Sequence, residues 1–194
     1  MNNSLFFVII LLGDIMKILK NNLKSKLNIR TENNYPIEGV EFVDITPLII
    51  DKANFNEIMD LFYEELKDKE IDYIVAPEAR GFLFGSGIAN RLGIGLIPIR
   101  KKGKLPPSSV ESTFSYEKEY GKDYLEIPKL LNESYKEKKI YLIDDIYATG
   151  NTLNSIKEEL IKLGSTIVGE GVLLNIKELN NNKDIFSIID INES

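Results

Sequence analysis

The chain has 194 residues, 43% of them hydrophobic, a length that suits one well-packed domain better than two. Its formal net charge of -6 argues against a nucleic-acid-binding surface spread over the protein, because such surfaces need clustered lysine and arginine. The chain contains no cysteine and no histidine, which excludes disulfides, thiolate nucleophiles, zinc sites of the Cys/His kind and imidazole acid–base chemistry.

An apolar run from Leu5 to Leu12 occupies the N-terminal segment. It is too short to span a bilayer, which takes about 20 apolar residues, and no basic residue precedes it as a signal peptide requires. We therefore expect Met16 to be the natural start, residues 1–15 to be a non-native or disordered extension, and residues 16–194 to form a single domain. The alternative, a membrane-tethered protein, rests wholly on this run.

The next part of the chain is predicted to hold one helix and one short strand. Apolar residues recur at helical spacing over residues 15–27, with lysine and asparagine between them. Residues 28–47 are irregular, but Val40, Phe42 and Ile45 alternate as in a short strand. This segment could form a cap over a ligand.

From residue 54 onward, amphipathic helices alternate with short apolar strands. Helices are expected at residues 54–67, at 82–92 before Gly93, and from about Thr152 to Gly164. Strands are expected at residues 71–76, 95–99, 140–143 and 166–168, with a long polar loop between the second and the third. This alternation predicts a mostly parallel α/β sheet flanked by helices. In such sheets ligands bind beyond the carboxyl ends of the strands, so we expect the site in the loops after residues 76, 99 and 143.

The segment from Tyr141 to Thr152 carries the strongest chemical signal. An apolar strand brings Asp144 and Asp145 to its end, and a small-residue loop then opens a helix. A helix N-terminus presents unpaired N–H groups and the positive end of the dipole, so this loop is predicted to wrap a monophosphate. The predicted phosphate-binding residues are Ala148, Thr149, Gly150, Asn151 and Thr152.

The two carboxylates before this loop must have another role, because a phosphate would repel them. Asp144 and Asp145 suit a pair of sugar hydroxyls, or an indirect hold on Mg²⁺, the natural hard cation where phosphates are present. The alternative is an acidic strand end with Thr152 as an ordinary helix cap. Competing nucleotide motifs fail, since the chain has no P-loop and Gly85-Ser86-Gly87 lacks the third glycine of the dinucleotide fingerprint.

Five segments, in order along the chain, resemble one enzyme family. Residues 143–152 resemble the phosphoribosyl-pyrophosphate loop of the type I phosphoribosyltransferases. The segments 44–48, 78–85, 98–106 and 119–122 are similar to those of the adenine phosphoribosyltransferases. Together the five cover about residues 28–172. The resemblance implies the type I phosphoribosyltransferase fold and purine salvage by transfer of a phosphoribosyl group from phosphoribosyl pyrophosphate to adenine, giving AMP and pyrophosphate.

The resemblance also implies roles for particular residues. Arg80, Arg100, Lys101 and Lys104 stand where the family binds pyrophosphate, and arginine and lysine suit such an anion. Residues 105–120 correspond to a flexible lid, and the stretch is long, polar and low in regular pattern. At its end, Glu119 matches the acid that helps to protonate the purine ring, with Tyr120 assisting.

The segment from residue 28 to 47 resembles the family's base-binding hood, which reads adenine mainly through backbone groups, here at Glu41 and Val43. The chain departs from the family at two site positions. Val43 stands where arginine is frequent, which backbone recognition tolerates. Asn151 stands where glycine is usual, and asparagine accepts left-handed backbone better than other residues with a side chain.

The resemblance implies Mg²⁺ carried mainly by the substrate, a homodimer and a cytoplasmic location, with no nucleic acid and no membrane among the partners. The absence of cysteine fits a reducing compartment. Two alternatives stay open. One is a transferase for hypoxanthine, xanthine or orotate, and the other is a non-catalytic phosphoribosyl-pyrophosphate sensor, for which the chain shows neither a DNA-binding helix-turn-helix nor a basic face.

Overall fold

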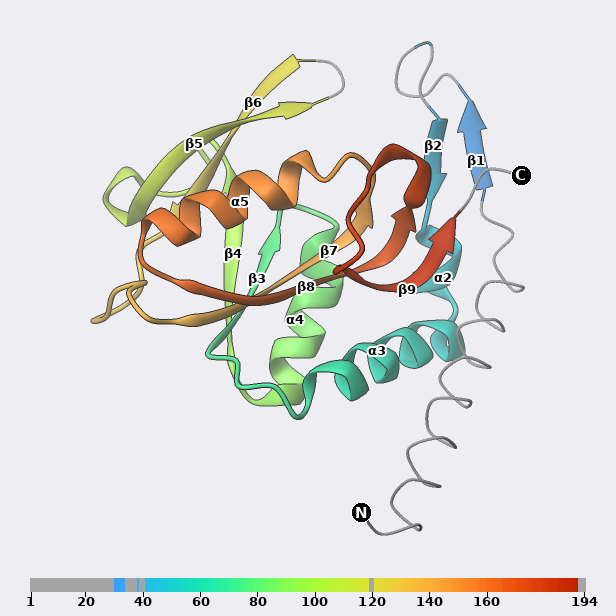
Figure 1. Cartoon of the computed structure of the whole chain (residues 1–194), viewed down its shortest axis with the longest axis horizontal. Coiled ribbons are helices and arrows are strands. Elements are labelled where there is room, and N and C mark those ends of the chain that lie inside the picture. The colour runs from blue at the N-terminus through green and yellow to red at the C-terminus, as the bar shows by residue number, and fades with distance from the viewer. Residues whose placement is uncertain (1–29, 34–37, 39–40, 119–120, 192–194) are drawn as a thin grey trace, which may run out of the picture. The chain divides into compact units, whose positions relative to one another are not determined.

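The computed structural model describes residues 30–33, 38, 41–118 and 121–191 (Figure 1). They fall into two compact units, residues 1–61 and 62–194, which we describe separately. A single domain over residues 16–194 stays a prediction. The apolar run at residues 5–12 and the predicted helix at 15–27 lie outside the described residues. Within the described part of the chain, no helix is long and apolar enough to cross a membrane.

The first unit contains a two-stranded antiparallel sheet, β1 (Arg30–Asn33) and β2 (Glu41–Asp44). The strand predicted from the alternation at residues 40–45 is therefore present as β2. A short helix that the sequence did not predict, α2 (Thr46–Ile50), follows, and the Asp44 carboxylate accepts a hydrogen bond from the Thr46 N–H at 2.9 Å. Helix α3 (Lys52–Leu66) begins in this unit and ends in the second.

The second unit is built on a seven-stranded sheet of order β5-β6-β4-β3-β7-β8-β9. Its strands are β3 (Tyr73–Pro77), β4 (Gly95–Lys101), β5 (Val110–Lys118), β6 (Gly121–Pro128), β7 (Lys139–Tyr147), β8 (Thr166–Ile176) and β9 (Phe186–Ile191). Strands β4, β3, β7, β8 and β9 lie next to one another in this order and pair in parallel. Strands β5 and β6 form an antiparallel hairpin, and β6 pairs antiparallel with β4. The predicted fold class, a mostly parallel sheet flanked by helices, is confirmed.

Two helices cover opposite faces of this sheet, α4 (Gly81–Leu92) and α5 (Asn151–Lys162). A side chain added at Gly85 of α4 would meet Ala76 at 2.7 Å and Ile74 at 3.5 Å, so this helix lies over the even-numbered residues of β3. Val75 points to the other face and joins the core cluster that contains Leu153 of α5. In Figure 1 the two helices accordingly lie on either side of the sheet.

Both predicted glycine stops lie at helix ends. Gly93 follows α4 with a left-handed φ of 69°, and its N–H donates to carbonyl groups of the last turn. Gly164 follows Leu163 at the end of α5 and has a φ of 93°. A residue with no Cβ adopts this backbone without strain.

The expectation that residues 105–120 lack regular structure is wrong for most of the segment. A short 3₁₀ helix at Pro107–Ser109 leads into β5, which pairs with β6 from Val110↔Pro128 to Lys118↔Gly121. Tyr116 of β5 is buried, and Phe114 packs against the same core cluster as α5. Two apolar residues at alternate positions are too few to stand out as a strand pattern, but they suffice to pack the hairpin against a helix.

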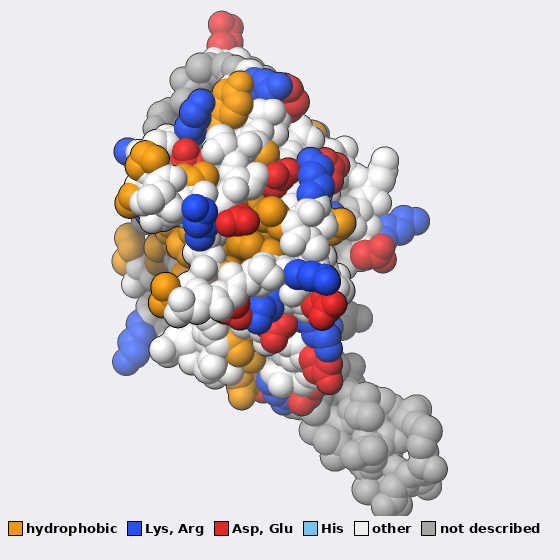
Figure 2. All heavy atoms as spheres, turned by 90° about the vertical axis from the view of Figure 1, so that its left-hand side faces the viewer, with side chains coloured by type: hydrophobic (Ala, Val, Ile, Leu, Met, Phe, Trp, Pro, Cys, Tyr) orange, Lys and Arg blue, Asp and Glu red, His pale blue; other side chains and the backbone are white. Residues whose placement is uncertain are grey.

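Charged side chains of both signs are interspersed on the face drawn in Figure 2, with hydrophobic side chains between them. Lysine and arginine are not gathered there into a continuous stripe. On this face, any strong affinity for an anion must therefore come from a local site.

Candidate active site

Strand β7 does not end at Ile143 as predicted but continues through the acidic pair to Tyr147. Its pairing with β3 stops at Val75↔Leu142, whereas its pairing with β8 runs on to Tyr147↔Asn175. The acidic pair therefore has a neighbouring strand on one side only. On the other side lies the start of α4, where a side chain added at Gly81 would meet the Asp144 carboxylate oxygen at 3.0 Å.

The two carboxylates of β7 are buried, with relative exposures of 8% for Asp144 and 5% for Asp145. Burial, followed by the charge of Asp145, raises the pKa of Asp144 well above its usual value. Asp145 forms an ion pair with Arg80, whose Nε lies 2.8 Å from Oδ2. The Asp144 carboxylate accepts a hydrogen bond from the Asp145 N–H at 2.8 Å.

A cavity of about 200 Å³ lies between Asp144 and the start of α5. Its lining includes Glu117 of β5, Asp144, and all five residues of the predicted phosphate loop, 148–152. Helix α5 begins at Asn151 after Gly150, and no side chain caps its first turn. The first N–H groups of the helix are therefore left for a ligand, and an anion is the ligand that they and the dipole favour.

Gly150 is required at its position for two reasons. Its φ of 83° is left-handed, and a Cβ there would lie 2.2 Å from the hydroxyl oxygen of Tyr147. Tyr147 itself is buried, with 3% relative exposure, so its ring fixes the path of the loop. Asn151 has no need of left-handed backbone, because among the described residues the only non-glycine residues with positive φ are Asn132 and Glu137.

Glu78, which the sequence pattern did not single out, joins the ends of β3 and β4. Its carboxylate accepts hydrogen bonds from Arg100 Nε at 2.9 Å and from the Lys101 N–H at 3.0 Å. The pairing with Arg100 lowers the pKa of Glu78. Its place two residues before Arg80, at the end of a buried strand, was the signal available in the sequence.

The predicted basic residues thus fall at neighbouring strand ends. Arg80 follows β3 and reaches β7 through Asp145, and Arg100 lies in β4 and is held by Glu78. Lys101 and Lys104 are exposed. The backbone turn that separates these lysines is anchored by Glu126 of β6, which accepts a hydrogen bond from the Gly103 N–H at 3.1 Å.

The remaining predicted site residues are described in part or not at all. Glu119 and Tyr120 lie outside the described residues, and so does the side chain of Glu41 in β2. Val43, also in β2, is buried with 8% relative exposure. Glu117, which sequence reasoning missed, lines the cavity. It could have been found from its place two residues before Glu119, because alternate residues of a strand share a face.

The described site combines a loop at a helix N-terminus and a buried carboxylate with basic side chains at neighbouring strand ends, which is an arrangement suited to phosphorylated sugars. The family model for the phosphoribosyl transferase domain matches residues 49–193. The chain is 45% identical over 155 residues to an adenine phosphoribosyltransferase of Clostridium acetobutylicum, covering 80% of this chain and 88% of the relative.

Solved structures give the same assignment. The structure of adenine phosphoribosyltransferase from Thermoanaerobacter pseudethanolicus matches with a TM-score of 0.78 at 36% identity, over 87% of this chain and 99% of that one. The Saccharomyces cerevisiae enzyme, solved with an imino-altritol bisphosphate and adenine, matches with a TM-score of 0.74 at 32% identity, over 89% of this chain and 99% of that one. The chain belongs to the adenine phosphoribosyltransferase family, and the predicted type I fold is confirmed.

Proposed function

We propose that this chain transfers the phosphoribosyl group of phosphoribosyl pyrophosphate to adenine, forming AMP and releasing pyrophosphate. The observation that carries the proposal is the cavity in which the phosphate loop 148–152 faces Asp144, in a chain of this family. Such a cavity suits a sugar that carries a phosphate at one end and hydroxyls at the other.

In this function the loop binds the 5′-phosphate. The first N–H groups of α5 and the hydroxyls of Thr149 and Thr152 supply the donors. Asp144, at the far side of the loop, accepts hydrogen bonds from the ribose hydroxyls. Asp145 holds Arg80 in place and contributes to the charge that keeps the pKa of Asp144 raised.

The leaving pyrophosphate is bound by Arg80, Arg100, Lys101 and Lys104. Asp145 and Glu78 hold the two guanidinium groups at the strand ends, so little rearrangement is needed when the diphosphate arrives. The sugar carbon becomes cationic as its bond to the diphosphate oxygen breaks. Catalysis is then mainly electrostatic: the cations stabilise the departing anion, and the adenine nitrogen forms the new bond to that carbon.

We assign the remaining roles from the family. Glu119 helps to protonate the purine ring as its other nitrogen attacks, and Tyr120 assists it. The hood, residues 28–47, reads adenine through backbone groups at Glu41 and Val43. Residues 105–120 close over the reactants and exclude water.

The residues around the cavity fit Mg²⁺ brought in by the substrate. Glu117 and Asp144 supply hard oxygen donors there. Bound Mg²⁺ neutralises part of the diphosphate charge. We further propose a homodimer in the cytoplasm, for which family membership and the cysteine-free sequence are the support.

The direct test is a stoichiometry assay on the full chain with adenine, phosphoribosyl pyrophosphate and Mg²⁺. We expect AMP and pyrophosphate in equal amounts, and no product when a chelator is in excess. A matched variant, Thr149→Val, keeps the side-chain shape but removes one donor of the loop, and it should raise the KM for phosphoribosyl pyrophosphate. Absence of AMP with a folded wild-type protein would overturn the proposal, and full turnover in chelator would overturn the role of Mg²⁺.

A further inference from the structure

An asparagine-rich turn between β8 and β9 contacts the back of the phosphate loop. The turn holds Asn180, Asn181 and Asn182, and it follows the short 3₁₀ helix Lys177–Leu179. The side-chain amide of Asn180 donates a hydrogen bond to the backbone oxygen of Ala148 at 2.9 Å. Ala148 is the first residue of the phosphate loop, so the turn and the loop are directly connected.

The same amide group anchors the turn to the end of β8. Asn180 Nδ2 lies 2.9 Å from the Ile176 carbonyl oxygen and 3.0 Å from Asn175 Oδ1. Its side-chain oxygen accepts a hydrogen bond from the Asn182 N–H at 3.1 Å. Asn180 therefore connects three pieces of backbone: the strand end, the turn and the phosphate loop.

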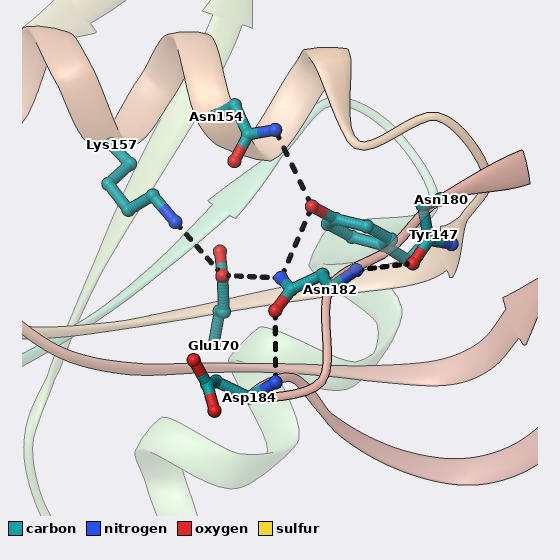
Figure 3. Close-up of polar contacts among 7 residues, drawn as sticks. All are labelled: Tyr147, Asn154, Lys157, Glu170, Asn180, Asn182 and Asp184. Atoms are coloured by element: carbon teal, nitrogen blue, oxygen red, sulfur yellow. Dashed lines mark hydrogen bonds and ion pairs between the residues drawn. The ribbon is translucent and has the colours of Figure 1, made fainter. Parts of the chain in front are cut away.

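Asn182 connects the turn to the buried tyrosine under the loop. Its side-chain amide lies 3.2 Å from the Tyr147 hydroxyl oxygen and 3.0 Å from Glu170 Oε1 (Figure 3). Glu170 is buried, with 8% relative exposure, and also binds Lys157 of α5 at 3.0 Å. The contact between Asn182 and Glu170 therefore ties the turn to the helix that the phosphate loop opens.

These contacts fix the direction of the loop's N–H groups. In a planar trans peptide the C=O and N–H point in opposite directions, so a carbonyl of Ala148 held by Asn180 turns the Thr149 N–H away from the turn. Tyr147, held by Asn182, lies against Gly150 and leaves no space for that residue to move toward it. An unliganded glycine-containing loop would otherwise sample several conformations.

We propose that Asn180 and Asn182 are positioning residues, which hold the phosphate loop in the conformation that presents its N–H groups to the 5′-phosphate. The inference rests on the proposed function, because it takes the ligand of the loop to be that phosphate. Neither residue lines the cavity that the phosphate loop faces. Their effect is to reduce the entropy that the loop loses on binding, so it falls on affinity for the phosphoribosyl end of the ligands.

The test compares two ligands that occupy different ends of the site. Dissociation constants for AMP, which needs the loop, and for pyrophosphate, which does not, are measured by calorimetry on the full chain with Mg²⁺. For Asn180→Ala we expect AMP binding to weaken about 10-fold, in the range for one lost hydrogen bond, while pyrophosphate binding stays within about twofold. The KM for phosphoribosyl pyrophosphate should rise by a similar factor, with kcat and the KM for adenine nearly unchanged.

Asn181→Ala is the matched control, because Asn181 is the exposed member of the same turn. It should leave both affinities and the melting temperature unchanged. Asn182→Ala should give the same selective loss of AMP binding, to a smaller extent. Tyr147→Phe keeps the ring but removes the hydroxyl, and it should have a similar small effect. These two keep the inference testable if Asn180→Ala does not fold.

Two results would overturn the inference. One is AMP binding within twofold of wild type in folded Asn180→Ala and Asn182→Ala. The other is an equal loss of AMP and pyrophosphate, which would mean general damage rather than positioning. Wild-type protein that binds neither ligand would instead refute the proposed function, so the two failures are distinguishable.

Discussion

At the residue scale, side chains from distant parts of the chain hold the acidic pair and the phosphate loop that follows it. An acidic pair followed by small residues and a helix is a local pattern, and all five loop residues line the cavity. The partners of this segment come from elsewhere in the chain: Arg80 pairs with Asp145 across 65 positions of sequence, and Asn180 reaches Ala148 across 32. Residue types alone do not reveal such pairs.

Asp144→Asn should separate binding from stability. Because the pKa of Asp144 is raised in the folded protein, folding disfavours its charged form, and stability is lost as pH rises from its usual pKa through the raised one. Asparagine removes this cost and keeps the acceptor for the Asp145 N–H. Without ligand at pH 8, we expect a melting temperature higher by about 2–4 °C for each kcal/mol recovered, with weaker binding of phosphoribosyl pyrophosphate.

The stability gain should shrink toward pH 4, where Asp144 is protonated in the native wild type. The exposed Asp68→Asn serves as the control and should shift the melting temperature at neither pH. Scanning fluorimetry across this pH range measures both effects. A variant that melts below wild type at pH 8 would contradict the account of Asp144.

Glu119→Gln tests the acid assigned from the family. Glutamine keeps the size of the side chain but cannot give up a proton, so turnover should fall by about 10²-fold, the range for a positioned acid. The KM for phosphoribosyl pyrophosphate should change little. Steady-state kinetics of Glu119→Gln are compared with those of a control variant, Glu111→Gln, which changes an exposed residue near the start of β5. A fall in turnover under about threefold would mean that Glu119 is not the acid.

At the element scale, the sequence predicted the parallel strands and the helices between them, because each is a short apolar or amphipathic run. It missed β1, α2, the β5–β6 hairpin and β9. The hairpin is polar, with Tyr116 buried and Phe114 packed on the core, so its strands depend on pairing with each other and on contact with α5. The length of β7 was also underestimated, because two aspartates inside a strand read as its end.

Glu78→Gln tests how two elements are joined. The charge of Glu78 holds Arg100 at the end of β4, so its removal should free the arginine and weaken pyrophosphate binding roughly 10-fold, while AMP binding changes less. Calorimetry with the two ligands measures this difference. Glu64→Gln, which removes an exposed partner of Lys67, should change neither affinity. Unchanged pyrophosphate binding in Glu78→Gln would show that Arg100 does not need this partner.

At the scale of the whole molecule, the protein carries a net charge of -6, so basic residues that bind an anion must lie together at one place. The order of the strands explains how they come together. Strand β3 lies between β4 and β7, so the loops that follow these three strands meet at one edge of the sheet. Two ion pairs connect these strand ends: Glu78 pairs with Arg100, and Asp145 pairs with Arg80. The alternation of strands and helices was enough to predict this edge.

The most direct test of the central claim is a panel of bases. Purified protein with phosphoribosyl pyrophosphate and Mg²⁺ is offered adenine, hypoxanthine, guanine, xanthine and orotate separately, and nucleotide product is recorded for each. Phosphoribosyl transfer to adenine predicts AMP from adenine and no product from the other four bases. Nucleotide formed from another base, or from none of the five, would contradict it.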